Sequence, residues 1–438
     1  MTASIIELPW GGAQLPLRLP GGWRVLGIFS PPSVKPACDP ETLCRDALAQ
    51  PTGARPFAAG SLNGKRVLMV VDDQSRPTPV AGFFRPIRDA LVRAGVNLGD
   101  IEILFALGAH RPMSQQEADA KIGKDNLAPH RWHNHNCFNP SELIDLGTTT
   151  RGTPVLVNRL LTQFDLIVLL GLIEPHLLLG FSGGLKMILP GCAGEETIGR
   201  NHLQGLSAAR FNYVGATADD SPMRLDLEDG VRLLQKEIFL VNAVLNPAGE
   251  VVRLFCGDPV EAFRLGADFV HHSSAVQVPE QADVVITNSR PFDADLRQGL
   301  KCFGNTLQAC RPGGLILGFL YCAQGMGDLP TPALTLRYPV LRTLLRLLGP
   351  KRIPRFSRWV SKQEPIEQQF LDQFGLRMLH RNHLWCYSDH LEPAATRKLG
   401  VVRQHTSLES MMAAAERKAG SSASVSVFPT GGATYVRG

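Results

Sequence analysis

Apolar, β-branched runs alternate with helix-length amphipathic segments along most of the chain. The run RVLMVVDD (66–73) predicts a strand that ends in two carboxylates, and FRPIRDALVRAG (84–95) predicts an amphipathic helix after it. IEILFALGAH (101–110) and DLIVLLGLIEPH (165–176) repeat the first pattern, because each is a buried strand followed by a histidine. Strands that lead through polar residues into helices are typical of α/β folds.

Chemically active side chains stand at the ends of these strands. In parallel sheets, the residues just past the carboxyl ends of strands line the ligand crevice. Asp72, Asp73, His110 and His176 all occupy such positions. The pattern therefore predicts that these four side chains converge.

The pattern restarts after about residue 258, so we expect a second, smaller α/β domain with a boundary near 258–275. This is an α/β fold class with two α/β domains, residues 1–265 and 275–438. The expected elements of the second domain are a strand and turn at 282–291, a helix at 296–310, a strand at 313–322, a helix at 367–381, a strand at 383–389, and a final helix and strand within 411–429.

The composition describes an ordinary globular protein. The 438 residues are 44% hydrophobic and 19% charged, which suits a chain with two cores. The longest apolar run, Leu166–Ile173, is far shorter than the roughly 20 residues of a membrane span. The nine cysteines include no C-x-x-C pair, and no signal-peptide pattern opens the chain. We expect a cytoplasmic protein without a membrane partner.

One segment, residues 337–358, is locally basic. It lacks the interleaved aromatic residues that stack on bases, so we interpret it as a solvated helix face and expect no nucleic-acid partner.

The stretch EPHLLLGFSGGLKMILPG (174–191) concentrates the candidate chemistry. GFSGG (180–184) matches the nucleophile elbow of α/β-hydrolases, with Ser182 as nucleophile. That elbow needs a strand directly before the serine and a helix directly after it, whereas Lys186 and Pro190 stand where the helix would begin. The paired glycines also suit a loop that cradles a phosphate through backbone N–H groups. A glycine turn that only reverses the chain is the third reading, and the residues alone leave all three open.

The other histidines divide into two groups. His110, His176 and His202 are too far apart in sequence for any metal-ligand spacing to link them. The segment HRWHNHNC (130–137) has denser spacing, but no second ligand pair follows it. We interpret that segment as a structural loop.

Four motifs, in this order, resemble the lactate racemase family of nickel-pincer-nucleotide enzymes. They are VDDQSRPTP (71–79), ALGAHRPMS (106–114), EPHLLLGFSGGLKMILPG (174–191) and ETIGRNH (196–202). Family members bind a pyridinium mononucleotide with thioacid groups, which holds nickel through one carbon and two sulfurs. A lysine is joined to this cofactor through a thioamide, and a histidine is the remaining nickel ligand.

The resemblance implies a role for each candidate residue. Lys186 would carry the cofactor covalently, and His202 would bind the nickel. His110 and His176 would be the acid–base pair. The remaining roles are cofactor binding for Asp73, Ser182, Gly183 and Gly184, and substrate binding for Arg76, Gln298 and Lys301.

The implied activity is that of an isomerase, a racemase or epimerase of a small-molecule 2-hydroxy acid. The active site would lie in the cleft between the domains, with the cofactor in the first and the second closing over the substrate. Hydride transfer to the cofactor makes a planar 2-keto acid, and each enantiomer then needs a base on its own side. Histidine suits both positions because its ordinary pKa is near neutrality. Cofactor-synthesis enzymes would be partners, because they load the nucleotide.

Two features depart from lactate-specific members. Those members have a tryptophan in a D-Q-W stretch, whereas IEQQFLDQF (366–374) has none, and the residues after His176 are unusually aliphatic. Both features predict a different or larger side chain on the 2-hydroxy acid. The alternative functions are a serine hydrolase that uses Ser182 and a homologue that binds a nucleotide or acid without turnover.

Overall fold

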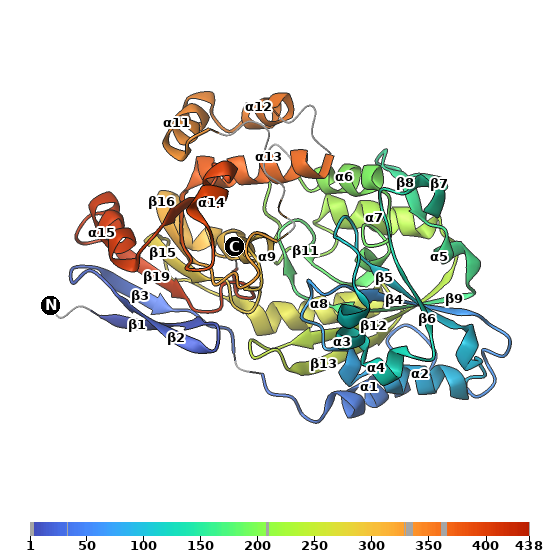
Figure 1. Ribbon diagram of the computed structural model, residues 1–438. Helices are drawn as coiled ribbons and strands as arrows, with labels where there is room; N and C mark the ends of the chain where they lie inside the picture. The colour runs from blue at the N-terminus through green and yellow to red at the C-terminus, as the bar shows by residue number, and fades with distance from the viewer. Residues whose placement is uncertain are drawn as a thin grey trace. The chain divides into compact units, whose positions relative to one another are not determined.

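The computed structural model describes residues 4–32, 34–206, 210–327, 329, 336–360 and 366–437. The chain divides into two compact units (Figure 1). Unit 1 consists of residues 1–32, 206–215 and 274–438, and unit 2 of residues 33–205 and 216–273. Each unit is built on a six-stranded sheet with helices around it, so the predicted α/β class is confirmed.

The sheet of unit 2 has the order β13-β12-β9-β4-β5-β6. Its strands are parallel except for β13, which runs antiparallel to β12. The central strands β4 and β9 are buried along their whole length, as their unbroken apolar sequences require. The bounds are β4 Val67–Asp72, β5 Ile101–Ala106, β6 Arg131–Asn134, β9 Leu166–Leu172, β12 Glu237–Leu245 and β13 Val251–Gly257.

The order of the strands in this sheet reverses next to β4. The chain passes from β4 to β5 and β6 on one side, and then returns to β9 on the other side of β4. At such a reversal the loops after neighbouring strands diverge, which leaves room for a ligand. The loops after β4, β5 and β9 carry the predicted site residues of this unit that lie nearest to the sheet.

Two strands are shorter than predicted. Strand β5 stops at Ala106, and His110 lies beyond it in a turn where Gly108 has a φ of 56°. Strand β9 stops at Leu172, and His176 belongs to a separate two-residue strand, β10 (Pro175–His176), paired with β11 (Gly180–Phe181).

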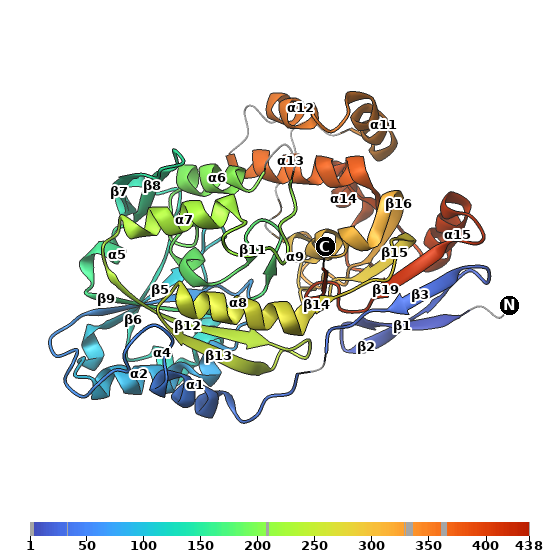
Figure 2. The same ribbon diagram turned by 180° about the vertical axis from the view of Figure 1, so that it is seen from behind.

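Helices cover both faces of the unit 2 sheet (Figures 1 and 2). Apolar side chains of α1 to α4 pack with one face in a single core, and Phe263 and Gly266 of α8 pack near the other. The bounds are α1 Pro40–Ala49, α2 Phe84–Arg93, α3 Gln115–Ile122, α4 Lys124–Leu127, α5 Leu160–Gln163, α6 Glu195–Gln204, α7 Pro222–Arg232 and α8 Glu261–Ser274, with a strand pair β7 Leu143–Thr148 and β8 Pro154–Asn158 and short 3-10 turns η1 Val80–Gly82, η2 Leu98–Asp100, η3 Pro140–Glu142 and η4 Gly184–Met187.

The sheet of unit 1 is parallel throughout, in the order β18-β17-β16-β15-β19-β3. The edge strand β3 comes from the N-terminus and satisfies the backbone of β19. For this reason the N-terminal residues belong to unit 1, whereas the predicted domains were the consecutive stretches 1–265 and 275–438. The bounds are β1 Ile5–Trp10, β2 Ala13–Arg18, β3 Arg24–Ile28, β14 Ala275–Val276, β15 Ala282–Asn288, β16 Cys310–Phe319, β17 His383–Tyr387, β18 Arg403–His405, β19 Ser424–Phe428 and β20 Tyr435–Val436.

One predicted helix of unit 1 was wrong. The segment 296–310 breaks into α9 (Leu296–Gly299), α10 (Lys301–Asn305) and a 3-10 turn, η5 (Leu307–Ala309), and Gly299 and Gly304 fall at the breaks or next to them. Glycine weakens a helix because it has the most backbone freedom to lose. The other predicted helices are present, and the bounds are α11 Tyr338–Leu348, α12 Ile353–Val360, α13 Ile366–Arg381, α14 Pro393–Leu399 and α15 Leu408–Ala419. Within the residues that the structure describes, no helix has the length and apolarity needed to cross a bilayer.

A buried lysine fixes the turn that follows β4. Lys121 Nζ lies 2.5 Å from Asp72 Oδ1 and donates to the carbonyl oxygens of Asp73 and Arg76, at 3.0 Å each. Thr78 donates its hydroxyl to Asp72 Oδ2 at 2.5 Å. Burial raises the pKa of Asp72, and the bonds from Lys121 and Thr78 oppose part of that rise. The turn is thus held at both its side chains and its backbone.

Lys121→Met should lower the free energy of unfolding by about 3–5 kcal/mol at neutral pH, because it leaves the Asp72 charge buried without its partner. The loss should shrink in acid, where Asp72 is protonated. Urea unfolding measures both effects. Lys124→Met, at an exposed position nearby, is the matched control and should change stability by less than about 0.5 kcal/mol. The double variant Asp72→Asn, Lys121→Met should recover part of the loss, and an equal loss in all three variants would contradict the pairing.

Candidate active site

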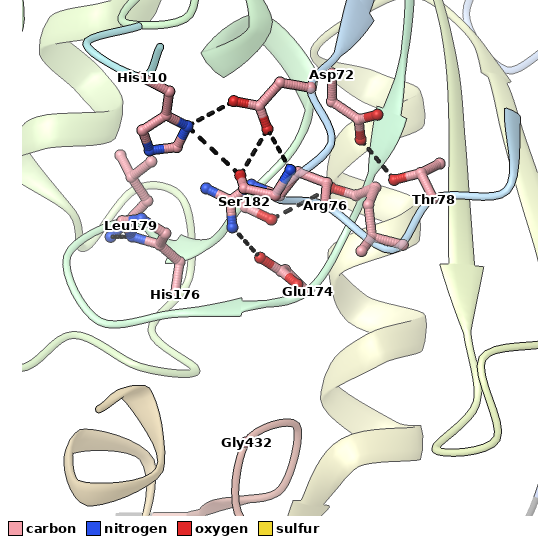
Figure 3. Close-up of polar contacts among 12 residues, drawn as sticks. Asp72, Arg76, Thr78, His110, Glu174, His176, Leu179, Ser182 and Gly432 are labelled. Carbon is pink, nitrogen blue, oxygen red and sulfur yellow. Dashed lines mark hydrogen bonds and ion pairs between the residues drawn. The ribbon is translucent and has the colours of Figure 1, made fainter. Parts of the chain in front are cut away.

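The ends of β4 and β5 meet through Asp73 and His110. The His110 ring nitrogen Nδ1 lies 2.5 Å from Asp73 Oδ2, and the other carboxylate oxygen accepts from the backbone N–H and the hydroxyl of Ser75 (Figure 3). A carboxylate can only accept, so Nδ1 of His110 carries a hydrogen, and in the neutral ring Nε2 carries the lone pair. Asp72, the preceding residue, points to Lys121 instead, as alternation along a strand requires.

Asp73 is held in its charged form. Burial alone would raise its pKa, but hydrogen bonds from His110 and Ser75 and the charges of His110 and Arg76 outweigh burial and keep the pKa well below its usual range. The ionised carboxylate can therefore orient the imidazole and stabilise it when it gains a proton.

A second contact joins the loops after β4 and β9. Arg76 Nη1 donates to Glu174 Oε1 at 2.7 Å, and the Glu174 side chain is only 4% exposed. Glu174 is not among the predicted site residues. The signal was present, because Glu174 follows a buried strand just as Asp73 does.

The hydrogen bond at Nδ1 of His176 has the opposite direction to that at Nδ1 of His110. Its Nδ1 accepts the backbone N–H groups of Leu178 and Leu179, both at 3.2 Å (Figure 3). A nitrogen that accepts carries no hydrogen, so the neutral ring has its hydrogen on Nε2. The two rings thus rest in opposite tautomers: His110 presents a lone pair at Nε2 and His176 presents an N–H there.

The glycine loop is tied to the sheet by its own polar groups. The backbone N–H of Ser182 donates to the backbone carbonyl oxygen of Glu174 at 2.8 Å, and its hydroxyl donates to the Leu172 carbonyl at 3.2 Å. Gly184 donates its N–H to Asn242 Oδ1 at 2.7 Å. Gly183 has a φ of 88°, and a Cβ there would stand 2.7 Å from the same amide oxygen. These donors face the protein, so the loop's glycines serve close packing on the ends of β9 and β12.

A buried arginine forms hydrogen bonds with the backbone of this loop. Arg224 donates to the carbonyl oxygens of Phe181 and Gly183, at 2.6 and 3.1 Å, and its guanidinium lies 4.0 Å from the centroid of the Phe263 ring. Burial lowers the pKa of Arg224 to about 9. No sequence signal pointed to Arg224, because it stands on α7 outside every motif.

Lys186 and His202 follow the loop. Lys186 lies in η4, and His202 lies in the last turn of α6, where its Nδ1 is 2.7 Å from the Ile198 carbonyl. That bond places a hydrogen on Nδ1, and a histidine that binds a metal through one ring nitrogen usually makes such a bond with the other. Asn201 anchors α6 through a 2.8 Å bond to the buried Asp226. Among the described residues, no three His, Cys, Asp or Glu side chains gather as a metal site. A metal at His202 would therefore need ligands from a bound cofactor.

The residues of the elbow motif do not form an elbow. Ser182 follows a two-residue strand and precedes a 3-10 turn, and its hydroxyl is bonded to a carbonyl. The HRWHNHNC segment has structural partners, because His130, His133 and His135 each bond a different group: the Ile101 carbonyl, Glu102 and the Ala193 carbonyl.

The remaining predicted residues belong to unit 1. Gln298 is buried on α9, where its N–H bonds the capping carboxylate of Asp295 at 2.8 Å. Lys301 begins α10, and its Nζ lies 4.6 Å from the centroid of the Phe292 ring. The other nine predicted site residues belong to unit 2. Among them, the side chains of Asp73 and His110 bond to each other.

Comparison with known proteins is consistent with this arrangement. Residues 10–212 match the family model of the lactate racemase N-terminal domain. The chain is 30% identical to the lactate racemase of Thermoanaerobacterium thermosaccharolyticum over 74% of its length and 75% of that protein. It is 26% identical to the lactate racemase of Lactiplantibacillus plantarum over 88% of each chain.

Solved structures agree in fold. The lactate racemase apoprotein of Thermoanaerobacterium thermosaccharolyticum superposes with a TM-score of 0.80 at 25% identity, covering 99% of this chain and 100% of that one. A protein of Thermotoga maritima shares the fold at 18% identity, with a TM-score of 0.66 over 91% of this chain and 99% of that one.

The opposite tautomers can be read directly by NMR of the histidine ring nitrogens. Near pH 8, His110 should carry its hydrogen on Nδ1 and His176 on Nε2, because their Nδ1 atoms face an acceptor and two donors respectively. Asp73→Leu should release His110 to the Nε2–H form and leave His176 unchanged. An Nδ1–H signal from His176 in the native protein would contradict the assignment.

The lowered pKa of Asp73 predicts a pH-dependent contribution to stability. Its folded-state pKa lies below the ordinary value of 3.8, so the ionised form adds stability above that pH and loses it as the pH falls through the folded-state pKa. Asp73→Asn should therefore destabilise the protein at pH 7 and progressively less below roughly pH 4. Urea unfolding of both proteins from pH 7 downward measures the difference, and a constant difference would show that the charge is not responsible.

Proposed function

The chain belongs to the lactate racemase family, and from that membership and the oppositely wired His110 and His176 we propose that it is a racemase or epimerase that inverts C2 of a 2-hydroxy acid. The tautomer pair is the observation that carries the proposal. In Figure 3 both rings project to the same side of the Arg76–Glu174 pair. Two imidazoles beside a cation suit a substrate that has a carboxylate and a hydroxyl.

His110 is the better prepared base. Its Nε2 lone pair can take the substrate's hydroxyl proton, while Asp73 stabilises the imidazolium that forms. His176 rests with a hydrogen on Nε2, so it is ready to donate a hydrogen bond to the opposite face of the substrate. Before it can act as a base at Nε2, its proton must move to Nδ1, which breaks the bonds from Leu178 and Leu179. The free-energy cost of preparing the base therefore differs between the two faces of the substrate.

The carboxylate of the substrate would be bound by cationic and amide groups. Arg76 already holds the Glu174 carboxylate at 2.7 Å, which demonstrates a geometry suited to a carboxylate oxygen. A substrate that enters would share this guanidinium or replace Glu174 at it. Gln298 and Lys301 are proposed to bind the same group.

The residues present fit the nickel-pincer nucleotide as cofactor. Lys186 would hold it covalently, and His202 would ligate nickel through Nε2, because the Ile198 carbonyl occupies Nδ1. When bound, this group would supply a reversible acceptor for the C2 hydride. Ser182 and Gly184 would then shape its site rather than donate to it, because their donors bond within the protein, and Gly183 and Asp73 would line the same site. Enzymes that synthesise the nucleotide would be the partners for loading.

The substrate is proposed to differ from lactate in its side chain. Phe374 stands in the D-Q-F stretch where lactate-specific members have tryptophan, and its ring packs edge-on against Phe211, with the centroids 5.7 Å apart. The altered aromatic ring and the aliphatic LLLGF segment favour a larger or more apolar substituent at C3. The geometry of Ser182 gives the serine hydrolase no support, and the presence of two differently wired bases favours turnover over simple binding.

The test uses holoprotein made together with the cofactor-synthesis enzymes. D- and L-2-hydroxy acids of increasing side-chain size are incubated in D₂O, and the enantiomers are separated by chiral chromatography. Racemisation with hydrogen retained at C2 is expected, because hydride stays on the cofactor. Racemisation with deuterium at C2 would indicate proton abstraction instead. Esters of the same acids are assayed in parallel, and release of alcohol from them with no racemisation of the acids would indicate the hydrolase.

His110→Ala and His176→Ala should each reduce racemisation by about 10²–10⁴-fold, because every turnover uses both faces. Formation of keto acid from a single enantiomer should survive in each variant, with opposite enantiomer preference. Single-turnover assays of the two enantiomers measure this preference. Equal weakening toward both enantiomers in both variants would contradict the two-base mechanism.

Lys186→Ala should abolish the cofactor adduct in intact-mass spectra of holoprotein, because the thioamide has no amine to form on. Lys124→Ala, at an exposed position of the same unit, should retain it. An adduct that persists in Lys186→Ala would place the attachment elsewhere.

A further inference from the structure

Helices α11 and α12 form the most basic part of the described chain surface. Residues 337–360 contain seven Lys or Arg and no Asp or Glu. One of the seven, Arg342, is buried and donates to the carbonyl oxygens of Leu379 and Asn382. The other six are exposed, namely Arg337, Arg346, Lys351, Arg352, Arg355 and Arg358. We call α11 and α12 together the basic helix pair.

The inner side of the basic helix pair is already packed. Leu341, Leu345 and Ile353 form a small core with Leu376 and Leu379 of α13. In both views, α11 and α12 lie outside α13 within unit 1 (Figures 1 and 2). Apolar side chains on the outer side are therefore not needed to hold the helices in place.

The outer side nevertheless carries large apolar residues. Leu347 is 79% exposed, Trp359 is 71% exposed and Val340 is 55% exposed. Val340 and Leu347 are seven residues apart and share one face of α11. On α12, Arg355 and Trp359 are four residues apart and therefore share one face, and the exposed Arg352 directly precedes the helix. Apolar anchors next to cations distinguish this surface from a solvated helix face.

We propose that the basic helix pair binds the surface of an anionic phospholipid bilayer. Surface-lying helices combine Lys and Arg with Trp and Leu, because the cations meet lipid phosphates while the apolar side chains enter the headgroup boundary. Trp359 suits this boundary, since its ring is apolar and its N–H is polar. The association is peripheral and requires no spanning helix.

Other occupants fit the surface less well. A second copy of the same face would set arginines against arginines without an acidic partner. A polynucleotide would satisfy the cations but leave Val340 and Leu347 against water, and among the aromatic residues described in the basic helix pair only Trp359 is exposed for stacking. The sequence pattern alone favoured a solvated face, because it did not show which apolar residues point outward.

Vesicle binding of the full chain tests the proposal. The protein should sediment with vesicles that contain phosphatidylglycerol and not with phosphatidylcholine vesicles, and added salt should weaken the binding. Trp359 emission should shift to shorter wavelength on binding, and Trp359→Phe should remove this shift. The signal is selective because Trp10, Trp23 and Trp385 are buried and Trp132 is partly buried.

Charge reversal provides the matched comparison. Arg352→Glu, Arg355→Glu should weaken vesicle binding by more than about 30-fold, because two cations that attract the anionic lipids are removed and two carboxylates that repel them are added. Arg417→Glu, Lys418→Glu on α15 changes the same charge at exposed positions of the same unit and should bind like the native protein. Circular dichroism confirms that each variant is folded. Equal binding to neutral vesicles, binding to oligonucleotides in place of vesicles, or no binding at all would each overturn the proposal.

Discussion

The fixed turn after β4 is the constraint on which the rest of the site in unit 2 depends. Lys121 buries its ammonium among Asp72 and the carbonyl oxygens of Asp73 and Arg76, so backbone and side chain are held together. A buried charge is costly unless it is paired and hydrogen-bonded, so these contacts fix the position of the turn. Asp73 and Arg76 can then face His110 and Glu174 without being free to move.

From that turn, the two halves of the site acquire different chemistry. The loop after β5 brings an imidazole to a charged carboxylate, whereas the hairpin after β9 brings one to two backbone N–H groups. In its neutral form, the same side chain thus has a lone pair at Nε2 in one place and an N–H there in the other. Such a division of roles comes from the partners at Nδ1, and the sequence motif is a histidine in both cases.

The glycine loop illustrates how a motif and its physical role can differ. Its glycines and serine suggested donors for a phosphate, but the Ser182 and Gly184 N–H groups bond Glu174 and Asn242. The loop is held as a rigid platform, and Arg224 supports it through two carbonyl oxygens. The platform fixes the backbone next to Lys186, which is what the proposed covalent attachment would require.

The sequence by itself determined the α/β class, the strands at β4, β5 and β9, and the family, because buried parallel strands require unbroken apolar runs and the motifs stand in a set order along the chain. It also placed Asp73 and His110 at strand ends, from which their meeting follows.

Only the tertiary structure decided the rest. Glu174, Lys121 and Arg224 join the site through contacts between residues 41 to 98 positions apart. The N-terminal strand β3 joins unit 1 because β19 leaves an open edge. Residues so distant along the chain leave no local sequence pattern, because hydrogen bonds and strand pairing depend on which groups lie close together in the fold.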